Sequence, residues 1–270
     1  MHTPRTLFVL YWRLIGAQVR SQMQYKVSFL LNLIGAFMAT IIDFLAVAVL
    51  FTRIPHLAGW SLGEVALLYG MSSVSFALAE MLSAALDTFD TYIAHGTFDR
   101  VLSRPLGAFF QVLTEDFRLR RLGRLTQGTL VLWLALTYLD LRWSPDKAVV
   151  LVVALASGFV IYSSILVMGA VLCFWTVQGK EATNIFTYGG DFMTSYPLEI
   201  YSDWLRHFVT FIVPLAFVNY YPALYLLDRT DPFGLPAWVR LLSPLVAILL
   251  ALLAWAAWTL GVRRYQSTGS

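Results

Sequence analysis

Residues 148–177 read AVVLVVALASGFVIYSSILVMGAVLCFWTV, thirty residues in a row without a charged side chain. A helix needs about 20 apolar residues to cross the hydrocarbon core of a bilayer, so this stretch is long enough to span a membrane. Three further stretches have the same character. Residues 27–51 contain one charge, Asp43; residues 65–86 contain one, Glu80; and residues 241–262 contain none. These four stretches predict a membrane protein built of helices.

The composition of the chain excludes a water-soluble globular protein. Of its 270 residues, 59% are hydrophobic and 13% are charged, and the mean hydropathy is +0.69. A soluble domain carries about 25% charged residues, so most of this exterior must face lipid. The single Cys excludes a disulfide framework and Cys-rich metal sites. The net charge of +3 does not indicate a nucleic-acid partner, because the basic residues lie between apolar stretches and not on one stripe.

Two shorter stretches extend the prediction to six membrane-spanning helices. Residues 122–139 contain Arg124 near their start, and its long side chain can reach the membrane surface. Three prolines break residues 197–227, and broken helices persist at membrane depth only where protein or a water-filled cavity satisfies the backbone. We therefore expect a re-entrant segment there, after a short span. The six expected spans are residues 27–51, 65–86, 122–139, 148–177, 182–196 and 241–262.

Positive charges assign an orientation to these spans. Thirteen of the 19 Lys and Arg residues fall at the two termini and in the loops on the same side, and six fall on the other side. Because cytoplasmic loops are enriched in Lys and Arg, we expect both termini in the cytoplasm and the protein in the plasma (inner) membrane. An additional span within residues 181–227 is the competing topology, since it would put Arg263 and Arg264 outside.

The N-terminal 26 residues carry apolar side chains on one helical face beside basic residues. This pattern predicts a helix that lies in the membrane interface. A signal peptide is the alternative, but Arg13 cuts its apolar core short. The apolar face consists of Leu7, Phe8, Tyr11, Leu14 and Ile15. We expect residues 1–270 to form a single transmembrane domain whose longest loop is residues 87–121.

No catalytic or nucleotide-binding pattern is present in the sequence. The four His residues lie far apart, and neither a His-Glu-x-x-His pair nor a Gly-x-Ser-x-Gly elbow occurs. Gly179-Lys180 matches the end of a phosphate-binding loop, but Phe174 and Glu181 stand where that loop needs Gly and Ser or Thr. We therefore expect no enzyme activity and no cofactor in this chain, so any ATPase that drives it must be another subunit.

Two blocks of residues resemble a known transporter family. Residues 96–106 read GTFDRVLSRPL, and the later block holds YP at 196–197, WLR at 204–206, IVPLAF at 212–217 and YPA at 221–223. Together with the six-span layout, these blocks resemble the membrane subunits of ABC-2-type transporters, in the branch with a Gly-x-x-Asp-x-x-Leu-x-Arg-Pro-Leu loop. The resemblance covers nearly the whole chain.

The resemblance implies a type V exporter-like transmembrane domain that acts as a permease within membrane lipids. It implies a second permease chain, the same or a sister subunit, and cytoplasmic ATPase subunits that bind ATP and Mg²⁺. Export of drugs, lipids or polysaccharides is the usual activity. A self-sufficient secondary transporter or channel is the alternative. Such a carrier is expected to show interrupted helices in both halves, and only the C-terminal half is interrupted here.

The longest loop is expected to couple the membrane domain to the ATPase. Within it, Phe98, Val101 and Leu102 are spaced as one apolar helical face, which Thr97 is suited to cap and Pro105 to end. The spacing alone fits a partner's groove and packing on the protein's own domain equally, and the resemblance favours the groove, with Phe98 as the anchor. The expected coupling residues are Phe98, Asp99, Arg100, Val101, Leu102, Arg104 and Pro105.

Three acids inside apolar stretches are candidate substrate-pathway residues, because ionisable groups at membrane depth are expensive and often functional. These acids are Asp43, Glu80 and Asp191. The alternative is that neighbouring Ser, Thr or Tyr residues, or a loop Arg, neutralise or hydrogen-bond each one. The resemblance to ABC-2-type permeases implies that the re-entrant segment closes the outer end of the pathway. The expected outer gate consists of Tyr196, Pro197, Pro214 and Pro222.

The first span also offers a face of small residues, which consists of Gly35, Ala36, Ala39 and Thr40. Such a face permits close approach of another helix. It fits dimerisation with a second permease and internal packing equally.

Overall fold

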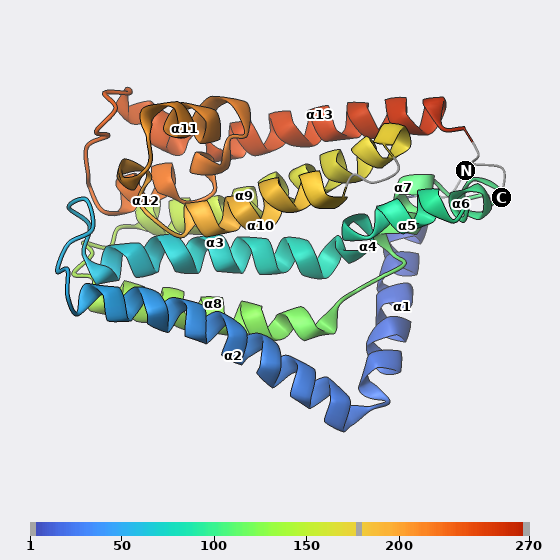
Figure 1. The fold of residues 1–270 in the computed structure, drawn as a ribbon, viewed down its shortest axis with the longest axis horizontal. Coiled ribbons are helices and arrows are strands. Elements are labelled where there is room, and N and C mark those ends of the chain that lie inside the picture. The colour runs from blue at the N-terminus through green and yellow to red at the C-terminus, as the bar shows by residue number, and fades with distance from the viewer. Residues whose placement is uncertain (1–3, 177–179, 267–270) are drawn as a thin grey trace.

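The protein is all-helical in its computed structural model, which describes residues 4–176 and 180–266. The long helices run side by side along one axis and form a bundle (Figure 1). They are α2, Lys26–Phe51; α3, Leu62–Leu82; α8, Leu122–Tyr138; α9, Pro145–Thr176; α10, Lys180–Thr194; and α13, Ser243–Arg264. The prediction of an all-helical membrane protein is confirmed.

Short helices cover the two ends of the bundle (Figure 1). At the end where α13 finishes, which we call the loop end, lie α4, Ala84–Asp87; α5, Phe89–Ala94; α6, Phe98–Leu102; α7, Ala108–Leu113; and η1, Leu119–Arg121. At the opposite end, which we call the hairpin end, lie η2, Leu198–Ile200; α11, Asp203–His207; η3, Phe208–Ile212; η4, Leu215–Phe217; α12, Tyr220–Leu226; and η5, Ala237–Leu241.

Four helices in the described residues are long and apolar enough to cross a membrane, namely α2, α3, α9 and α13. The helices α8 and α10 have 17 and 15 residues, which makes them about 22–26 Å long, shorter than a hydrocarbon core of about 30 Å. The pair Asp203–Ile212 and Leu215–Leu226 is also apolar enough, but it is bent by 73° around Pro214. The last residue of the expected span 148–177, Val177, lies outside the described residues, as does Gly179.

The helix α1, Pro4–Met23, runs across the bundle axis at the loop end (Figure 1). Ile15 is buried against the protein, whereas Phe8 and Trp12 are exposed. This arrangement fits a helix that lies in the membrane interface with aromatic side chains toward lipid. Leu7 of the expected apolar face has a side chain outside the described part of the chain.

The centre of the bundle is α3, which is buried along nearly its whole length. Two glycines allow α3 and α8 to approach closely, because a Cβ on Gly70 would lie 2.8 Å from the backbone of Leu132, and one on Gly128 would lie 2.8 Å from the Cβ of Ser73. Small residues at such contacts let helix backbones pack tightly within a membrane.

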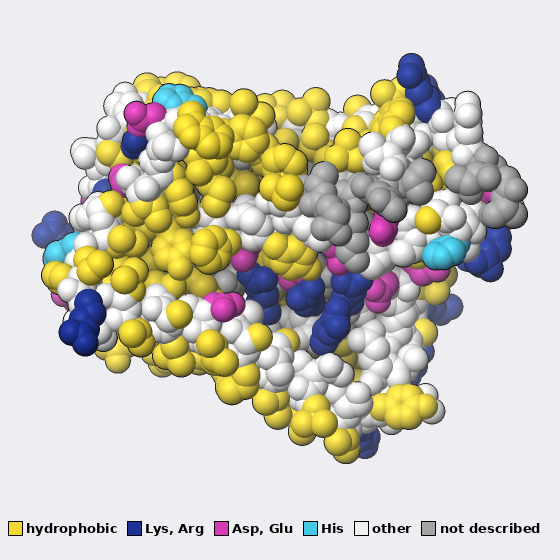
Figure 2. Space-filling model, viewed as in Figure 1, with side chains coloured by type: hydrophobic (Ala, Val, Ile, Leu, Met, Phe, Trp, Pro, Cys, Tyr) yellow, Lys and Arg dark blue, Asp and Glu magenta, His cyan; other side chains and the backbone are white. Residues whose placement is uncertain are grey.

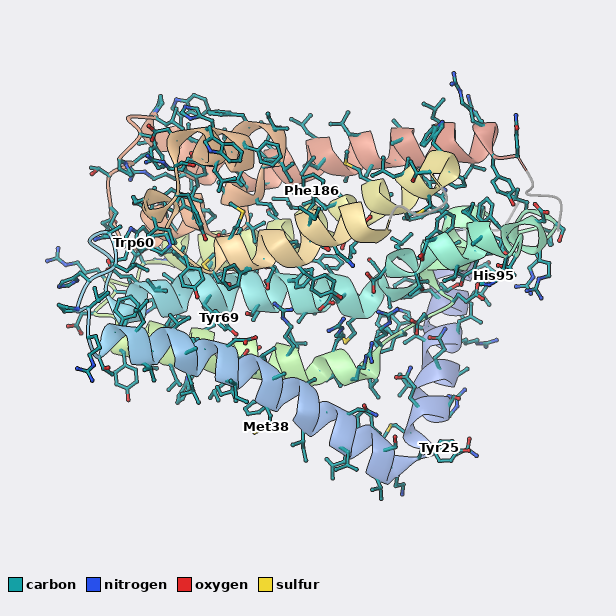
Figure 3. All side chains as sticks on the ribbon, in the orientation of Figure 1. Tyr25, Met38, Trp60, Tyr69, His95 and Phe186 are labelled. Carbon is teal, nitrogen blue, oxygen red and sulfur yellow. The ribbon has the colours of Figure 1, made fainter. Side chains whose placement is uncertain are left out.

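The helix α2 lies at the edge of the bundle and exposes most of its apolar side chains. Tyr69 on α3 points toward α2 and donates a hydrogen bond to the carbonyl oxygen of Thr40 at 2.9 Å, while Met38 points away from the bundle (Figure 3). The small-residue face expected on α2 is therefore divided. Ala36 and Thr40 turn toward the bundle, whereas Gly35 and Ala39 are exposed, with nothing within 4 Å of a Cβ on Gly35.

Candidate functional site

A cluster of buried charges joins α3, α8 and α10. Arg124, near the start of α8, pairs with Asp191 on α10 and lies 3.7 Å from Glu80 near the end of α3. Arg121 also pairs with Glu80. Figure 2 shows Lys and Arg side chains gathered with Asp and Glu side chains in a hollow of the surface between α2 and the upper helices. Two arginines therefore meet two acids within the bundle.

The cluster is completed by aromatic groups. The Tyr188 hydroxyl donates to Oε1 of Glu80 at 2.7 Å and accepts from Nη2 of Arg121 at 3.0 Å. The Arg124 guanidinium lies 4.6 Å from the centre of the Phe76 ring, close enough for a cation–π contact. A buried charge is tolerated when it is paired and hydrogen-bonded. Glu80, which is 5% exposed, is both paired with arginine and hydrogen-bonded to Tyr188.

A network of hydroxyl groups extends the cluster toward the hairpin end. Ser72 donates to Oδ1 of Asp191 at 3.1 Å and also contacts the Tyr162 hydroxyl at 2.8 Å. Tyr162 in turn contacts the Thr194 hydroxyl at 2.9 Å. The buried Asn219, at the start of the hairpin helix α12, donates to the carbonyl oxygen of Thr194 at 2.5 Å. A continuous chain of hydrogen bonds thus connects the charge cluster with α12 at the hairpin end.

The structure brings two of the three candidate acids together and leaves the third apart. Glu80 and Asp191 share Arg124 as an ion-pair partner. For these two acids the structure therefore agrees with the alternative, in which an Arg neutralises the acid. Asp43 is exposed on α2 and has no ion-pair partner within residues 4–176 and 180–266. The prediction that Arg124 reaches to the membrane surface is wrong, because its side chain is 12% exposed and turns inward to the two acids.

The sequence did not predict the ion pairs of Arg124 or the hydrogen bonds of Tyr188 with Glu80 and Arg121. A signal was present, since Arg124 and Glu80 both lie at the loop-end turns of their stretches, where opposite charges in adjacent helices can meet. That signal does not identify which helices are adjacent. The contact between α8 and α10 joins residues 67 positions apart in the chain.

The loop expected to couple to the ATPase has its aromatic anchor turned inward. Phe98 is 0% exposed, and its ring centre lies 5.3 Å from that of Phe89, 5.5 Å from that of Phe174 and 5.0 Å from that of Tyr265. The prediction that Phe98 and Val101 face outward is therefore wrong, because both are buried against the protein's own helices. The aromatic cluster instead fixes α6 to the ends of α9 and α13.

The outer side of the same loop is polar and exposed. Leu102 is 43% exposed, and the other exposed members of the expected set are Asp99, Arg100, Arg104 and Pro105. We call these five residues the loop ridge. The helix α6 ends at Leu102 and not at Pro105, and Thr97 makes no side-chain capping bond, in contrast to both expectations.

Beside the loop ridge is a cavity of 440 Å³, lined in part by Arg100, Arg104, Tyr92 and Glu115. Burial, and then the charge of Glu115, raise the pKa of the Tyr92 phenol, so Tyr92 stays protonated and neutral at physiological pH. The cavity therefore offers two cations and one carboxylate at the end of the molecule.

The expected gate residues lie at breaks between the helices near the hairpin end. Pro197 precedes η2, Pro214 separates η3 from η4, and Pro222 lies in the first turns of α12. Tyr196 is half-buried, with its ring centre 5.4 Å from that of Phe192. Each proline thus stands where a helix starts or stops, as its fixed φ and missing N–H require. Their action as a gate stays a prediction.

Comparison with known proteins identifies the family. A family model described as ABC-2 family transporter protein matches residues 37–269. The chain belongs to the ABC-2 family. The match includes the charge cluster, the loop ridge and the short helices of the hairpin end, and it confirms the resemblance to ABC-2-type permeases, while the branch with the specific loop motif stays a prediction. Searches of curated proteins and of solved structures each give no match.

Membership of the ABC-2 family makes the chain a multi-pass membrane permease of the ABC transporter class, and permeases of this family work with ABC ATPase partners. Among the residues that the structure describes, no group of three or more His, Cys, Asp or Glu side chains is arranged to hold a metal ion.

Proposed function

We propose that this ABC-2 chain is the permease subunit of an ATP-driven exporter in the plasma membrane. Its substrate is drug-like, a lipid or a polysaccharide, and separate cytoplasmic ATPase subunits bind the ATP and Mg²⁺. A second permease chain, the same or a sister subunit, completes the pathway. The observation that carries the proposal is the two-sided loop: its ridge is exposed, while Phe98 fixes it to α9 and α13.

The proposed topology has six spans and both termini in the cytoplasm. Three observations support it. The helix α1 begins and α13 ends at the loop end (Figure 1), thirteen of the 19 basic residues are assigned to that side, and the helix pair of residues 203–226 is bent by 73° and so does not form one straight span. In this topology the loop ridge faces the cytoplasm, where an ATPase can reach it.

The proposed mechanism uses the loop as a rigid lever. An ATPase that binds the loop ridge moves α6, and the aromatic contacts of Phe98 transmit the movement to α9 and α13. The buried charge cluster holds α3, α8 and α10 together during this movement. Asp43, exposed on α2 without an ion-pair partner in the described chain, is the acid that remains available to attract a cationic or amphipathic substrate in the pathway.

Substitutions of Phe98 and Leu102 distinguish binding of the ATPase from transmission of its movement to the membrane helices. Phe98→Ala keeps every side chain of the loop ridge but opens the aromatic cluster, at a cost of about 3–5 kcal/mol in stability. We expect the ATPase to stay bound and to hydrolyse ATP without transport. Leu102→Ala truncates an exposed side chain, so we expect weaker ATPase binding and normal coupling of the complex that forms. The measurement is the ratio of substrate transported to ATP hydrolysed in proteoliposomes.

Phe98→Leu is the control for folding, because it keeps an apolar side chain of similar size and should retain most of the coupling. Transport coupled at the parent ratio in Phe98→Ala would contradict the lever. Transport at the parent rate without any ATP would favour the self-sufficient carrier instead.

A further inference from the structure

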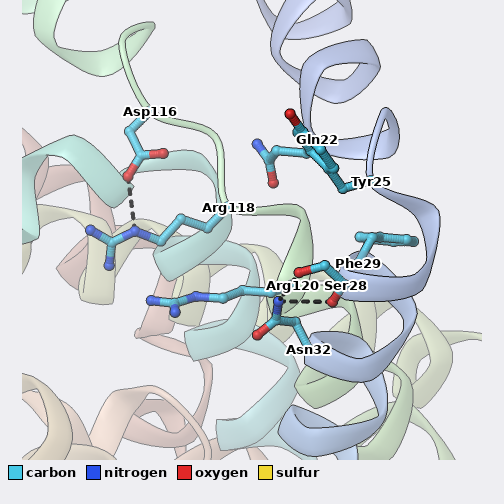
Figure 4. A pocket seen from close by; sticks show the side chains of 8 residues that line it. All are labelled: Gln22, Tyr25, Ser28, Phe29, Asn32, Asp116, Arg118 and Arg120. Carbon is cyan, nitrogen blue, oxygen red and sulfur yellow. Dashed lines mark hydrogen bonds and ion pairs between the residues drawn. The ribbon is translucent and has the colours of Figure 1, made fainter.

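A cavity of 370 Å³ opens at the elbow where α1 meets α2, beside residues 116–120 (Figure 4). Tyr25 and Phe29 line it from the elbow, Asn32 lies one turn further along α2, and Arg120 lies on the opposite wall. Because α2 is a membrane-spanning candidate that begins at Lys26, we expect this elbow pocket to lie at the depth where a bilayer presents its headgroups.

The wall of the elbow pocket is fixed by two glutamines on α1. Gln18 accepts a hydrogen bond from the backbone N–H of Phe117 at 2.6 Å and donates to the carbonyl oxygen of Thr114 at 2.5 Å. Gln22 accepts from the backbone N–H of Leu119 at 3.1 Å and donates to the carbonyl oxygen of Phe117. Each side-chain amide thus acts as a two-sided clamp on residues 114–119. The clamp holds this segment, and with it Arg120, at a set position beside α2.

The charges at the elbow pocket favour an anion. Arg118 is bound to two carboxylates, those of Asp116 and Asp87, at 2.9 Å each. Arg120 is exposed and has no ion-pair partner in the described residues, and the same holds for Lys26, which follows the lining residue Tyr25 in the sequence. The charged side chains that line the pocket are Arg118, Arg120 and Asp116, so the lining carries more positive than negative charge.

The surface next to the elbow pocket favours a lipid over a soluble anion. The side chains of Val27 and Leu31 on α2 are 74% and 66% exposed, and Leu30 and Ile34 are also exposed. Tyr25, 72% exposed at the start of α2, is typical of the membrane interface. A phosphate group in the pocket would therefore have its acyl chains along the apolar side of α2.

We propose that the elbow pocket binds the headgroup of an anionic phospholipid of the phosphatidylglycerol type. Arg120 and Lys26 attract its phosphate, Ser28 and Asn32 offer hydrogen-bonding groups, and the acyl chains lie on the exposed face of α2. Basic pockets at the cytoplasmic ends of membrane helices are known to favour anionic headgroups. The proposal requires only that α2 crosses a bilayer and is independent of the ATPase.

Native mass spectrometry of the purified chain, exchanged into equal amounts of phosphatidylglycerol and phosphatidylcholine, tests the proposal. The parent protein should retain phosphatidylglycerol preferentially. Arg120→Gln should reduce this preference by about fivefold, the factor that corresponds to about 1 kcal/mol per basic residue at an anionic surface. Arg120→Lys, which keeps the charge, should retain most of the preference. Since Arg120 is exposed and unpaired, neither variant is expected to affect folding.

Arg53→Gln is the matched control, because Arg53 is an exposed arginine at the opposite end of α2. It should leave the preference unchanged. The proposal is overturned if Arg120→Gln binds both lipids like the parent, or if Arg53→Gln lowers the preference equally. Addition of millimolar sn-glycerol 3-phosphate should not displace the lipid. Full displacement would show that the pocket recognises phosphate without the acyl chains and would overturn the lipid assignment.

Discussion

Arg124 contacts acids on two other helices, so the buried charge cluster depends on it. Asp191→Asn removes the closer carboxylate and leaves Arg124 with Glu80 at 3.7 Å. Removal of one partner from a buried pair costs about 3–5 kcal/mol, so we expect a lower melting temperature in detergent. Adding Arg124→Gln should restore part of the lost stability, because the arginine that lost its closer carboxylate is then gone. Glu80 keeps its ion pair with Arg121. Asp43→Asn, at an exposed position, should melt like the parent, and an Asp191→Asn variant that does the same would contradict this assignment.

At the residue scale, the sequence predicts which side chains are unusual but not what they contact. Glu80 and Asp191 stand out because acids are rare in apolar stretches. Their partner Arg124 is fixed by the packing of helices that are far apart in the chain. Likewise, the spacing of Phe98 and Val101 predicts a shared apolar face. Its inward direction depends on aromatic residues of α9 and the C-terminal region, which no local pattern connects to the loop.

The contact between α3 and α8 makes a prediction at the scale of elements. Gly70→Val would force side-chain carbon into the backbone of Leu132 and should destabilise the bundle by about 3 kcal/mol or more. Gly35→Val is the matched control, because nothing lies within 4 Å of a Cβ there. Thermal melts of both variants check this. Equal melting temperatures of the two variants would contradict the close packing of α3 on α8. A change of oligomeric state in Gly35→Val alone would indicate that the exposed small residues of α2 contact the second permease.

The long elements follow from the sequence, since long apolar stretches with at most one charge have few structures available in a bilayer. The short elements do not. The hairpin bend at Pro214 could be predicted as a break but not as a 73° turn. The division of the loop into an exposed ridge and a buried anchor depends on α6 being one turn long, because a helix that short takes its orientation from its neighbours.

For the whole molecule, the proposed orientation can be tested with cysteines, because Cys173 is the single Cys in the sequence and is buried. In a Cys173→Ser background, Thr52→Cys lies at the hairpin end and Ser103→Cys beside the loop ridge, both at exposed positions. We expect a membrane-impermeant maleimide to label Thr52→Cys in intact cells and Ser103→Cys only after permeabilisation. The reverse order of labelling would put the loop ridge outside and end the proposal of ATPase docking there.

The most direct test of the whole account is the rate of ATP hydrolysis that co-purifies with the tagged chain from its host membranes. We predict that a soluble ATPase remains bound to the parent chain and to Arg53→Glu. The double variant Arg100→Glu with Arg104→Glu reverses the charge of the loop ridge, and it should reduce the co-purified hydrolysis by about tenfold or more, since like charges across an interface cost several kcal/mol. Hydrolysis that is absent from the parent preparation, or that is unchanged in the double variant, would contradict the account.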